Sequence, residues 1–321
     1  MEVQLKLNEV TQAACMPSMH AALKGTPLTS VFEKRMGSFP RRARELIQNR
    51  RASTTVTASN TREDLLSQIL QTKEKHPELV DERVMHGYAT TPLLAGADTV
   101  TIGLTSVVYF VGRHRAVASK LRAELDTYGL EMPPRWSAVY KLPYLDAVIR
   151  ESFRCHPIGA MLSRRGVPEG RVLTLPDGRI LPAGTAVAVS GWATHFDKGV
   201  YGADAADFRP ERWLKGDGED EDEYAERLRR MNKADLTWGH GDRACMGKNI
   251  ARCEMYKLMA TLYSTFDVSS CQDYCCVMAR PLTMPTDTTH ASRSRVEDPR
   301  DCARQAGGCR GHDFVAPRQE H

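Results

Sequence analysis

The stretch with the clearest chemistry is residues 238–247, WGHGDRACMG, in which three glycines surround a single cysteine, Cys245. A segment of good helix propensity follows, so the sulfur is predicted to lie at a helix amino terminus, where the dipole and free N–H groups favour a thiolate. Glycines let the backbone approach a flat ligand closely, and Arg243 adds a cation that can pair with a ligand carboxylate. These features suit ligation of haem iron by the Cys245 thiolate.

The same loop is compatible with two other interpretations. The pattern Gly239-x-Gly241 also fits a plain turn or a dinucleotide-binding loop. A Rossmann loop follows a strand and sits in a βαβ unit. Residues 233–236 make a poor strand, and no acidic partner stands at the expected distance on a second strand. The sequence therefore favours a haem loop over a dinucleotide loop.

A second group of polar residues could form a charged network. Glu151 and Arg154 are three residues apart, so on a helix they share a face and can pair. Taken alone, a Glu-x-x-Arg pattern is typical of an exposed helical ion pair. Inside a core the pair needs further hydrogen bonds. Arg212 is a suitable third member of such a charge-assisted network.

A third candidate, Asp98-Thr99, stands in the apolar segment 92–112, where Asp98 is the only charge before the flanking residues. A membrane-spanning helix would place this carboxylate near mid-bilayer at high cost, so we expect a helix through the centre of a globular core. The Thr99 hydroxyl can bond the carbonyl four residues earlier and open the helix locally. Pro92 is expected to kink or interrupt the helix. A buried ion pair between Asp98 and a distant arginine is the structural alternative.

Four segments resemble signatures of the cytochrome P-450 superfamily and occur in the family's order. Residues 238–247 are similar to its haem-binding pattern FGxGxRxCxG, with Trp238 in place of the leading phenylalanine. Residues 151–154 resemble its ExxR pair, residues 208–213 (FRPERW) its PERF or PERW segment, and residues 95–99 (AGADT) its AGxDT centre. Each pattern is short, but four of them in the family's order rarely occur together by chance.

The resemblance assigns expected roles to individual residues. It implies that Cys245 is the axial ligand of haem b and that Asp98 and Thr99 relay protons for oxygen activation. It implies cofactor-binding roles, including pairing of the arginines with haem propionates, for Arg243, Arg164, Trp238 and Gly239. It implies a structural network of Glu151, Arg154 and Arg212.

The implied activity is that of a haem-thiolate monooxygenase, which inserts one oxygen atom from O2 into a small apolar organic substrate. Electrons would come from NADPH through a cytochrome P-450 reductase docked near Lys248, Arg252 and Lys257. Small or aliphatic residues at 158–162 and 95–97 imply an apolar pocket. Residues 176–213 look most like fungal enzymes that include the pisatin-demethylase group, which points to fungal secondary metabolism.

Two alternatives from other classes stay open. One is a haem-thiolate isomerase or dehydratase that needs no reductase, which an intact Asp98-Thr99 pair disfavours. The other is a truncated, non-catalytic remnant. Family members are much longer, and the resemblance implies that the membrane anchor, the first helices and the small sheet are missing at the front. It also implies that the closing β-hairpin has no convincing counterpart in the tail.

The predicted fold is mainly α, the carboxyl-terminal part of the cytochrome P-450 fold, with a helical core and a small β-sheet at 171–190. We expect helical segments over residues 1–60, a haem-binding core over 61–268, and a divergent, disordered tail over 269–321. Helical spacing is clearest at 114–127, 144–156 and 248–266.

Composition excludes several classes of protein. The net charge of +4, from 44 basic and 40 acidic residues, is too slight to indicate a nucleic-acid partner. Nine cysteines without a repeated spacing argue against a secreted disulfide scaffold, and those in the tail lack zinc-ligand spacing. The polar amino terminus predicts neither signal peptide nor membrane anchor. We therefore expect a cytoplasmic protein, and the resemblance to the cytochrome P-450 superfamily implies association with the cytoplasmic face of the endoplasmic reticulum as the alternative.

One acidic run needs a separate interpretation. Residues 217–223, DGEDEDE, could form a divalent-metal site, but the sequence favours an exposed, flexible linker.

Overall fold

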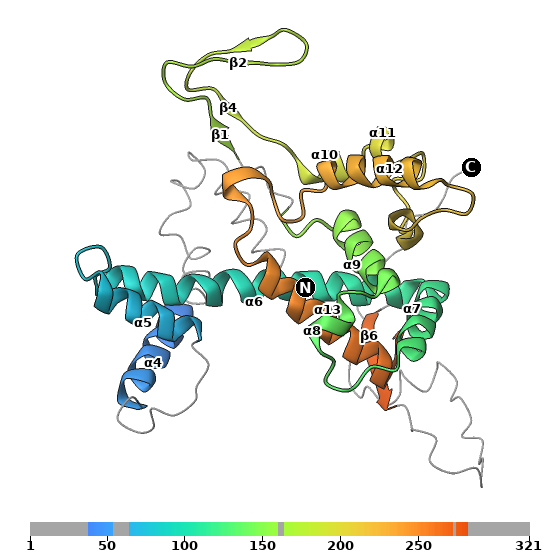
Figure 1. The fold of residues 1–321 in the computed structure, drawn as a ribbon, viewed down its shortest axis with the longest axis horizontal. Coiled ribbons are helices and arrows are strands. Elements are labelled where there is room, and N and C mark those ends of the chain that lie inside the picture. Colours follow the sequence, from blue (N-terminus) through green and yellow to red (C-terminus); the bar gives the residue numbers. More distant parts are fainter. Residues whose placement is uncertain (1–37, 54–63, 160–163, 272–273, 282–321) are drawn as a thin grey trace, which may run out of the picture. The chain divides into compact units, whose positions relative to one another are not determined.

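The computed structural model describes residues 38–53, 64–159, 164–271 and 274–281 (Figure 1). The chain divides into two compact units, Met1–Ser264 and Thr265–His321. The described residues are mainly helical, with short two-stranded pieces, which confirms the predicted fold class. The predicted boundaries at 60 and 268 stay predictions.

The first unit contains most of the helices. Its amino-terminal half has α4 (Ser38–Ser53), α5 (Leu65–Lys75), α6 (Glu82–Arg113), α7 (Arg115–Tyr128), α8 (Trp136–Val139) and α9 (Pro143–Cys155). Its second half has α10 (Gly191–His195), α11 (Lys198–Tyr201), α12 (Glu221–Ala234) and α13 (Lys248–Thr265), with 3-10 turns η1 (Pro210–Trp213) and η2 (Gly241–Arg243). The helices α7, α9 and α13 match the three segments in which helical spacing is clearest.

Two short antiparallel pairs of strands follow α9. Strand β1 (Arg165–Gly166) pairs with β4 (Ala186–Val187), and β2 (Leu173–Thr174) pairs with β3 (Ile180–Leu181). The β2–β3 turn has Gly178 at φ +84°, a conformation that favours glycine, and its N–H donates to the Leu175 carbonyl at 2.9 Å. The small sheet predicted at 171–190 thus consists of two separate pairs.

The second unit contains an antiparallel hairpin of β5 (Phe266–Cys271) and β6 (Tyr274–Pro281), with Phe266 opposite Pro281. The prediction of disorder beyond residue 268 is therefore wrong for residues 269–271 and 274–281. The apolar runs here are too short to show a clear period, so the pattern did not reveal the strands. Residues 282–321 lie outside the described part of the chain.

Helix α6 begins at its cap Asp81, whose side chain accepts the Val84 N–H at 2.7 Å. The helix continues through Pro92 without a break, so the expected interruption is wrong. Tertiary contacts hold both sides of the proline. Met85 belongs to an apolar cluster with residues of α4 and α5, and the carboxyl-terminal half packs against α7 and α9.

The middle of α6 is more exposed than the sequence indicates. It is the one helix of the described residues that is long and apolar enough to cross a membrane, and 22% of its most apolar window is buried. Its buried residues are Met85, Gly103, Ser106, Val107 and Val111, whereas Ala95, Ala97, Thr99 and Thr101 are exposed. The expectation of a helix through the centre of the core is therefore wrong for its middle turns, because the described neighbours pack near its ends.

Helix α9 has more buried residues than any other described element and receives its cap from another helix. Its N-cap residue, Leu142, has no side chain that can accept a hydrogen bond. Glu124 of α7 accepts instead from the backbone N–H groups of Tyr144 and Leu145, at 2.7 and 2.9 Å. Burial raises the pKa of Glu124, and these two hydrogen bonds oppose that rise. A carboxylate at this end also complements the helix dipole.

The acidic run at 217–223 is partly helical. Asp220 accepts the Glu223 N–H at 2.7 Å and caps α12, whose first turn contains Glu221, Asp222 and Glu223. Acidic side chains are favourable there because of the helix dipole. The flexible-linker prediction is therefore wrong for these residues. In the described chain, His, Cys, Asp and Glu form no group of three suited to a metal ion.

Gly103 is a buried glycine of α6 that packs closely against side chains of α9 and α13. A Cβ added there would lie 3.1 Å from Phe153 of α9, 3.1 Å from the Met255 sulfur of α13, and 3.0 Å from Ile158. At such distances a side chain at position 103 would fit only if these neighbouring side chains shifted by a few tenths of an ångström.

We predict that Gly103→Val lowers the free energy of unfolding of the haem-free protein by about 1–3 kcal/mol, because the added methyl groups overpack this contact. The measurement is urea unfolding followed by circular dichroism. Gly87→Val is the matched control, since a Cβ at Gly87 meets nothing within 4 Å. Because valine has a higher helix propensity than glycine, the control should lose no stability, and equal losses in the two variants would contradict a packing effect at Gly103.

Candidate active site

Glu151 of α9 is the centre of a fully buried polar network, and its side chain is 0% exposed. Oε1 accepts from Arg154 Nη2 at 2.8 Å, Arg212 Nε at 3.0 Å and the Arg209 backbone N–H at 2.9 Å. Oε2 accepts from Arg154 Nε and Trp213 Nε1, both at 2.9 Å. Five donors therefore satisfy one buried carboxylate, which is what a charge away from water requires.

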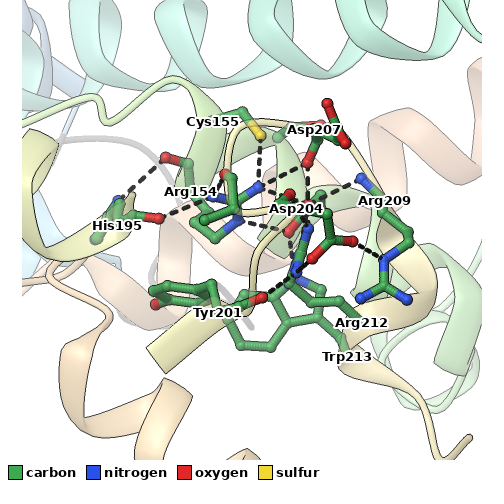
Figure 2. Close-up of polar contacts among 12 residues, drawn as sticks. Arg154, Cys155, His195, Tyr201, Asp204, Asp207, Arg209, Arg212 and Trp213 are labelled. Atoms are coloured by element: carbon green, nitrogen blue, oxygen red, sulfur yellow. Dashed lines mark hydrogen bonds and ion pairs between the residues drawn. The ribbon is translucent and has the colours of Figure 1, made fainter. Parts of the chain in front are cut away.

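Arg154 uses its remaining donors on backbone carbonyls (Figure 2). Nη1 donates to His195 at 2.8 Å and to Ala205 at 2.6 Å, and Nη2 donates to Asp207 at 2.9 Å. The predicted helical pair is thus also a clamp on a segment some fifty residues further along the chain.

Arg212 makes a second clamp on the same segment (Figure 2). Its guanidinium donates to the Tyr201 carbonyl, to Asp204 Oδ1 at 3.1 Å and to the Asp204 carbonyl at 2.9 Å. Partial burial acts to raise the pKa of Asp204, but the hydrogen bond and charge of Arg212 lower it overall. The two buried guanidiniums therefore share the Glu151 charge, and Arg212 also pairs with a second carboxylate, that of Asp204.

The structure thus brings together Glu151, Arg154 and Arg212, the three residues grouped by the sequence. Sequence reasoning missed Asp204 and the indole N–H of Trp213. Trp213 stood within the FRPERW segment, so its position carried a signal, whereas nothing in the pattern marked Asp204.

The loop that precedes α13 is closed by its own backbone. The Cys245 N–H donates to the Trp238 carbonyl at 2.7 Å, and the Gly239 N–H donates to the Leu236 carbonyl at 3.0 Å. Gly239 and Gly241 both have φ +67°, the left-handed region in which glycine avoids strain. The glycine spacing therefore fixes a tight turn that presents Cys245 at its end.

This cysteine loop is tied to α9 through an aromatic contact. The Trp238 ring meets the Phe153 ring edge to face, with centroids 6.2 Å apart. Phe153 is adjacent to Arg154 in the sequence, so the ring contact and the charged network start from the same turn of α9.

The donor set of the loop fits a flat, apolar, metal-containing ligand. Cys245 is exposed, and so are the glycines around it. Large apolar side chains beyond the sulfur also face outward, since Met246 is 98% and Ile250 62% exposed. Arg243 is exposed at the end of η2, and no described residue pairs with its guanidinium. One soft sulfur ligand, apolar flanks and a free cation are the groups that haem with its propionates requires.

The other predicted site residues lie on separate elements. Arg164 is exposed just before β1, and its carbonyl accepts from Arg165 at 3.0 Å. Asp98 is half-buried on α6, and no described cation pairs with it. Among the described residues, no contact joins these two side chains to Cys245. Of the predicted pocket residues 158–162, only 158 and 159 are described.

Thr99 bonds within its own helix, as its position predicts. Its hydroxyl donates to the Ala95 carbonyl at 2.6 Å, four residues earlier. Thr101 and Thr105 make the same bond, so this contact does not by itself distinguish Thr99. The helix is continuous here, and the expected local opening is absent from α6.

We predict that Glu151→Gln lowers the free energy of unfolding by about 3–5 kcal/mol, because it removes the charge that two buried guanidiniums share and leaves Arg154 without its carboxylate partner. Glu226→Gln is the matched control: Glu226 also pairs with an arginine three residues away, but in the open. This control should leave unfolding unchanged within error. Denaturant unfolding of both variants is the measurement, and equal effects would contradict a buried, shared charge.

Comparison with known proteins identifies the family. The family model for cytochrome P-450 matches residues 6–288. A cytochrome P-450 monooxygenase of Aspergillus candidus, cfoH, is 42% identical over 205 residues, which are 64% of this chain and 38% of that protein. The cytochrome P-450 monooxygenase vrtE of Penicillium aethiopicum is 33% identical over 78% of this chain and 50% of its own length. Pisatin demethylase of Fusarium vanettenii is 38% identical over 54% of this chain and 32% of its own.

A solved structure shows the fold alone. The crystal structure of a cytochrome P-450 (CYP102L1) superposes with a TM-score of 0.61 at 22% identity, covering 84% of this chain and 56% of that one. The chain spans half or less of the length of the two monooxygenases above. The match over residues 6–288, together with the cysteine loop and the buried Glu–Arg network, shows that the chain belongs to the cytochrome P-450 family.

Proposed function

We propose that this protein acts as a haem-thiolate monooxygenase, inserting one oxygen atom from O2 into a small apolar organic substrate in fungal secondary metabolism. The observation that carries the proposal is Cys245, an exposed thiol at the end of a glycine-rich loop that its own backbone closes. The printed names of the fungal relatives, cytochrome P-450 monooxygenases among them, support the reaction class.

In this proposal five residues would hold haem b. Cys245 Sγ would ligate the iron, Arg243 and Arg164 would pair with propionates, and Trp238 and Gly239 would shape the loop that carries the sulfur. Bound haem supplies a redox-active iron, and thiolate ligation favours cleavage of the O–O bond. The protein contributes the position of the sulfur. This position is fixed by the backbone hydrogen bond from the Cys245 N–H to the Trp238 carbonyl, which is 2.7 Å long.

The remaining chemistry of a monooxygenase is the supply of protons. One oxygen atom leaves as water, so two protons must enter the site for each turnover. We assign this relay to the Asp98 carboxyl and the Thr99 hydroxyl on the open middle turns of α6. The Thr99 hydroxyl donates to the Ala95 carbonyl, so its oxygen keeps lone pairs free to accept a hydrogen bond from a proton donor in the site.

Electrons would enter from NADPH through a cytochrome P-450 reductase on the cytoplasmic side of the endoplasmic reticulum. Of the three cations expected at the docking face, Lys248 is exposed and no described carboxylate pairs with it. Arg252 lies 3.7 Å from Asp146, which offsets part of its charge, and Lys257 is half-buried. Lys248 is therefore the strongest candidate for contact with an acidic partner.

The first test is the absorbance spectrum of the haem-reconstituted protein, reduced under carbon monoxide. We expect the red-shifted Soret band of a thiolate–CO complex, and its loss in Cys245→Ala. Cys253→Ala, which removes a half-buried thiol of α13, should keep the band.

Three other results would count against the proposal. A histidine-like band in the unaltered protein would contradict Cys245 as ligand. Absence of any band would favour a non-catalytic remnant. A product that forms without NADPH and reductase would favour an isomerase or dehydratase.

We also predict that Thr99→Ala, in reactions with reductase and an apolar substrate, lowers the product formed per NADPH oxidised by about 100-fold or more, the usual contribution of a proton-transfer group. Thr101→Ala is the control, because Thr101 is also exposed on α6 and bonds its own helix at 2.7 Å. Equal losses in both variants would assign the effect to the helix and not to a relay.

A further inference from the structure

His195 links the charged network to the cysteine loop by direct hydrogen bonds. It is the last residue of α10 and is 0% exposed. Its Nε2 lies 2.8 Å from the Leu236 backbone nitrogen, and its Nδ1 lies 3.3 Å from the Arg154 carbonyl. Its own carbonyl accepts from Arg154 Nη1 at 2.8 Å (Figure 2).

These partners determine where the imidazole proton lies. A backbone N–H can only donate, so Nε2 must be the bare, accepting nitrogen. The proton is then on Nδ1, where it points to a carbonyl that can only accept. In a protonated ring the Nε2–H group would face the Leu236 backbone N–H, and two donors cannot bond each other. The contact therefore requires the neutral form of His195.

The surrounding charges act on the ring from two sides. Asp235 Oδ1 lies 3.6 Å from Nε2, and the Arg154 guanidinium lies at the His195 carbonyl. Burial lowers the pKa of His195, while the Asp235 charge acts to raise it. The lowering dominates, so the ring is neutral at neutral pH.

The backbone that His195 holds leads directly into the loop. The Leu236 carbonyl accepts the Gly239 N–H at 3.0 Å, and the Trp238 carbonyl accepts the Cys245 N–H at 2.7 Å. One imidazole therefore separates the Arg154 clamp from the first turn of the loop that presents the cysteine.

We propose that His195 is the positioning residue of the cysteine loop: its neutral ring, protonated on Nδ1, transmits the position of the buried Glu151–Arg154–Arg212 network to Leu236 and so to Cys245. This inference rests on the proposed function only in that Cys245 is the iron ligand. The mechanical link itself exists in the haem-free protein.

The test compares His195→Phe with His195→Gln. Phenylalanine keeps a ring of similar size but removes the acceptor, whereas the glutamine side-chain oxygen can take the place of Nε2 and accept from Leu236. In the haem-free protein, His195→Phe should raise amide hydrogen exchange of residues 236–245 by about tenfold, as loss of one buried hydrogen bond implies, while exchange across α9 stays unchanged. His195→Gln should restore most of the protection.

Acid supplies a second readout. The neutral His195 ring stabilises the cysteine loop fully above the usual imidazole pKa of about 6.5. This stabilisation is lost progressively as the pH falls below that value. The exchange rate of residues 236–245 in the unaltered protein, relative to His195→Gln at each pH, should therefore rise below about pH 6. After haem reconstitution, the thiolate–CO fraction should fall in His195→Phe and recover in His195→Gln.

Folded His195→Phe with unchanged exchange would overturn the inference. Equal loosening by phenylalanine and glutamine would also overturn it, since packing alone would then explain the effect. If His195→Phe does not fold, Leu236→Pro removes the donor and leaves the histidine intact, and the same local loosening is required. Should the unaltered protein take up no haem, the proposed function fails while the exchange data still decide the role of His195.

Discussion

The buried carboxylate of Glu151 is the constraint on which the described fold of the first unit depends. Two guanidiniums share it, and charges in a dry interior are tolerated only when every donor finds a partner. The N–H groups of Arg154 and Arg212 that do not contact Glu151 therefore need other acceptors, and they donate to backbone carbonyls of residues 195–207. That segment has little regular secondary structure, so the arginine side chains supply the hydrogen bonds that a longer helix or sheet would otherwise provide.

The same turn of α9 orders the cysteine loop by two different kinds of contact. Phe153 meets the Trp238 ring, and the Arg154 carbonyl meets the His195 ring, which in turn meets Leu236. The apolar contact thus reaches the loop at Trp238, and the hydrogen bonds through His195 reach it at Leu236, two residues earlier. A flat ligand held through the Cys245 sulfur, as proposed, would need such support, because a single sulfur ligand does not fix the orientation of the ligand.

The sequence predicted the features that local geometry determines. Residues three apart on a helix must share a face, so Glu151 and Arg154 could be paired in advance. Glycines in the left-handed region close a turn, so the loop around Cys245 could also be recognised. Glu124, Asp204 and His195 could not be found in this way, since their partners are 8 to 41 residues away and the contacts depend on tertiary packing. Hydrophobic pattern likewise could not show that the middle turns of α6 are exposed, because it records which residues are apolar and not what covers them.

The five threonines of α6 have a consequence for how this helix meets its surroundings. Each hydroxyl, at residues 90, 91, 99, 101 and 105, donates to a carbonyl of the preceding turn. With its proton turned inward, a threonine shows its neighbours mainly a methyl group, much as valine does. The outer surface of these turns is thus more apolar than the number of threonines suggests. A hydrocarbon ligand that covers it would remove few polar groups from contact with water.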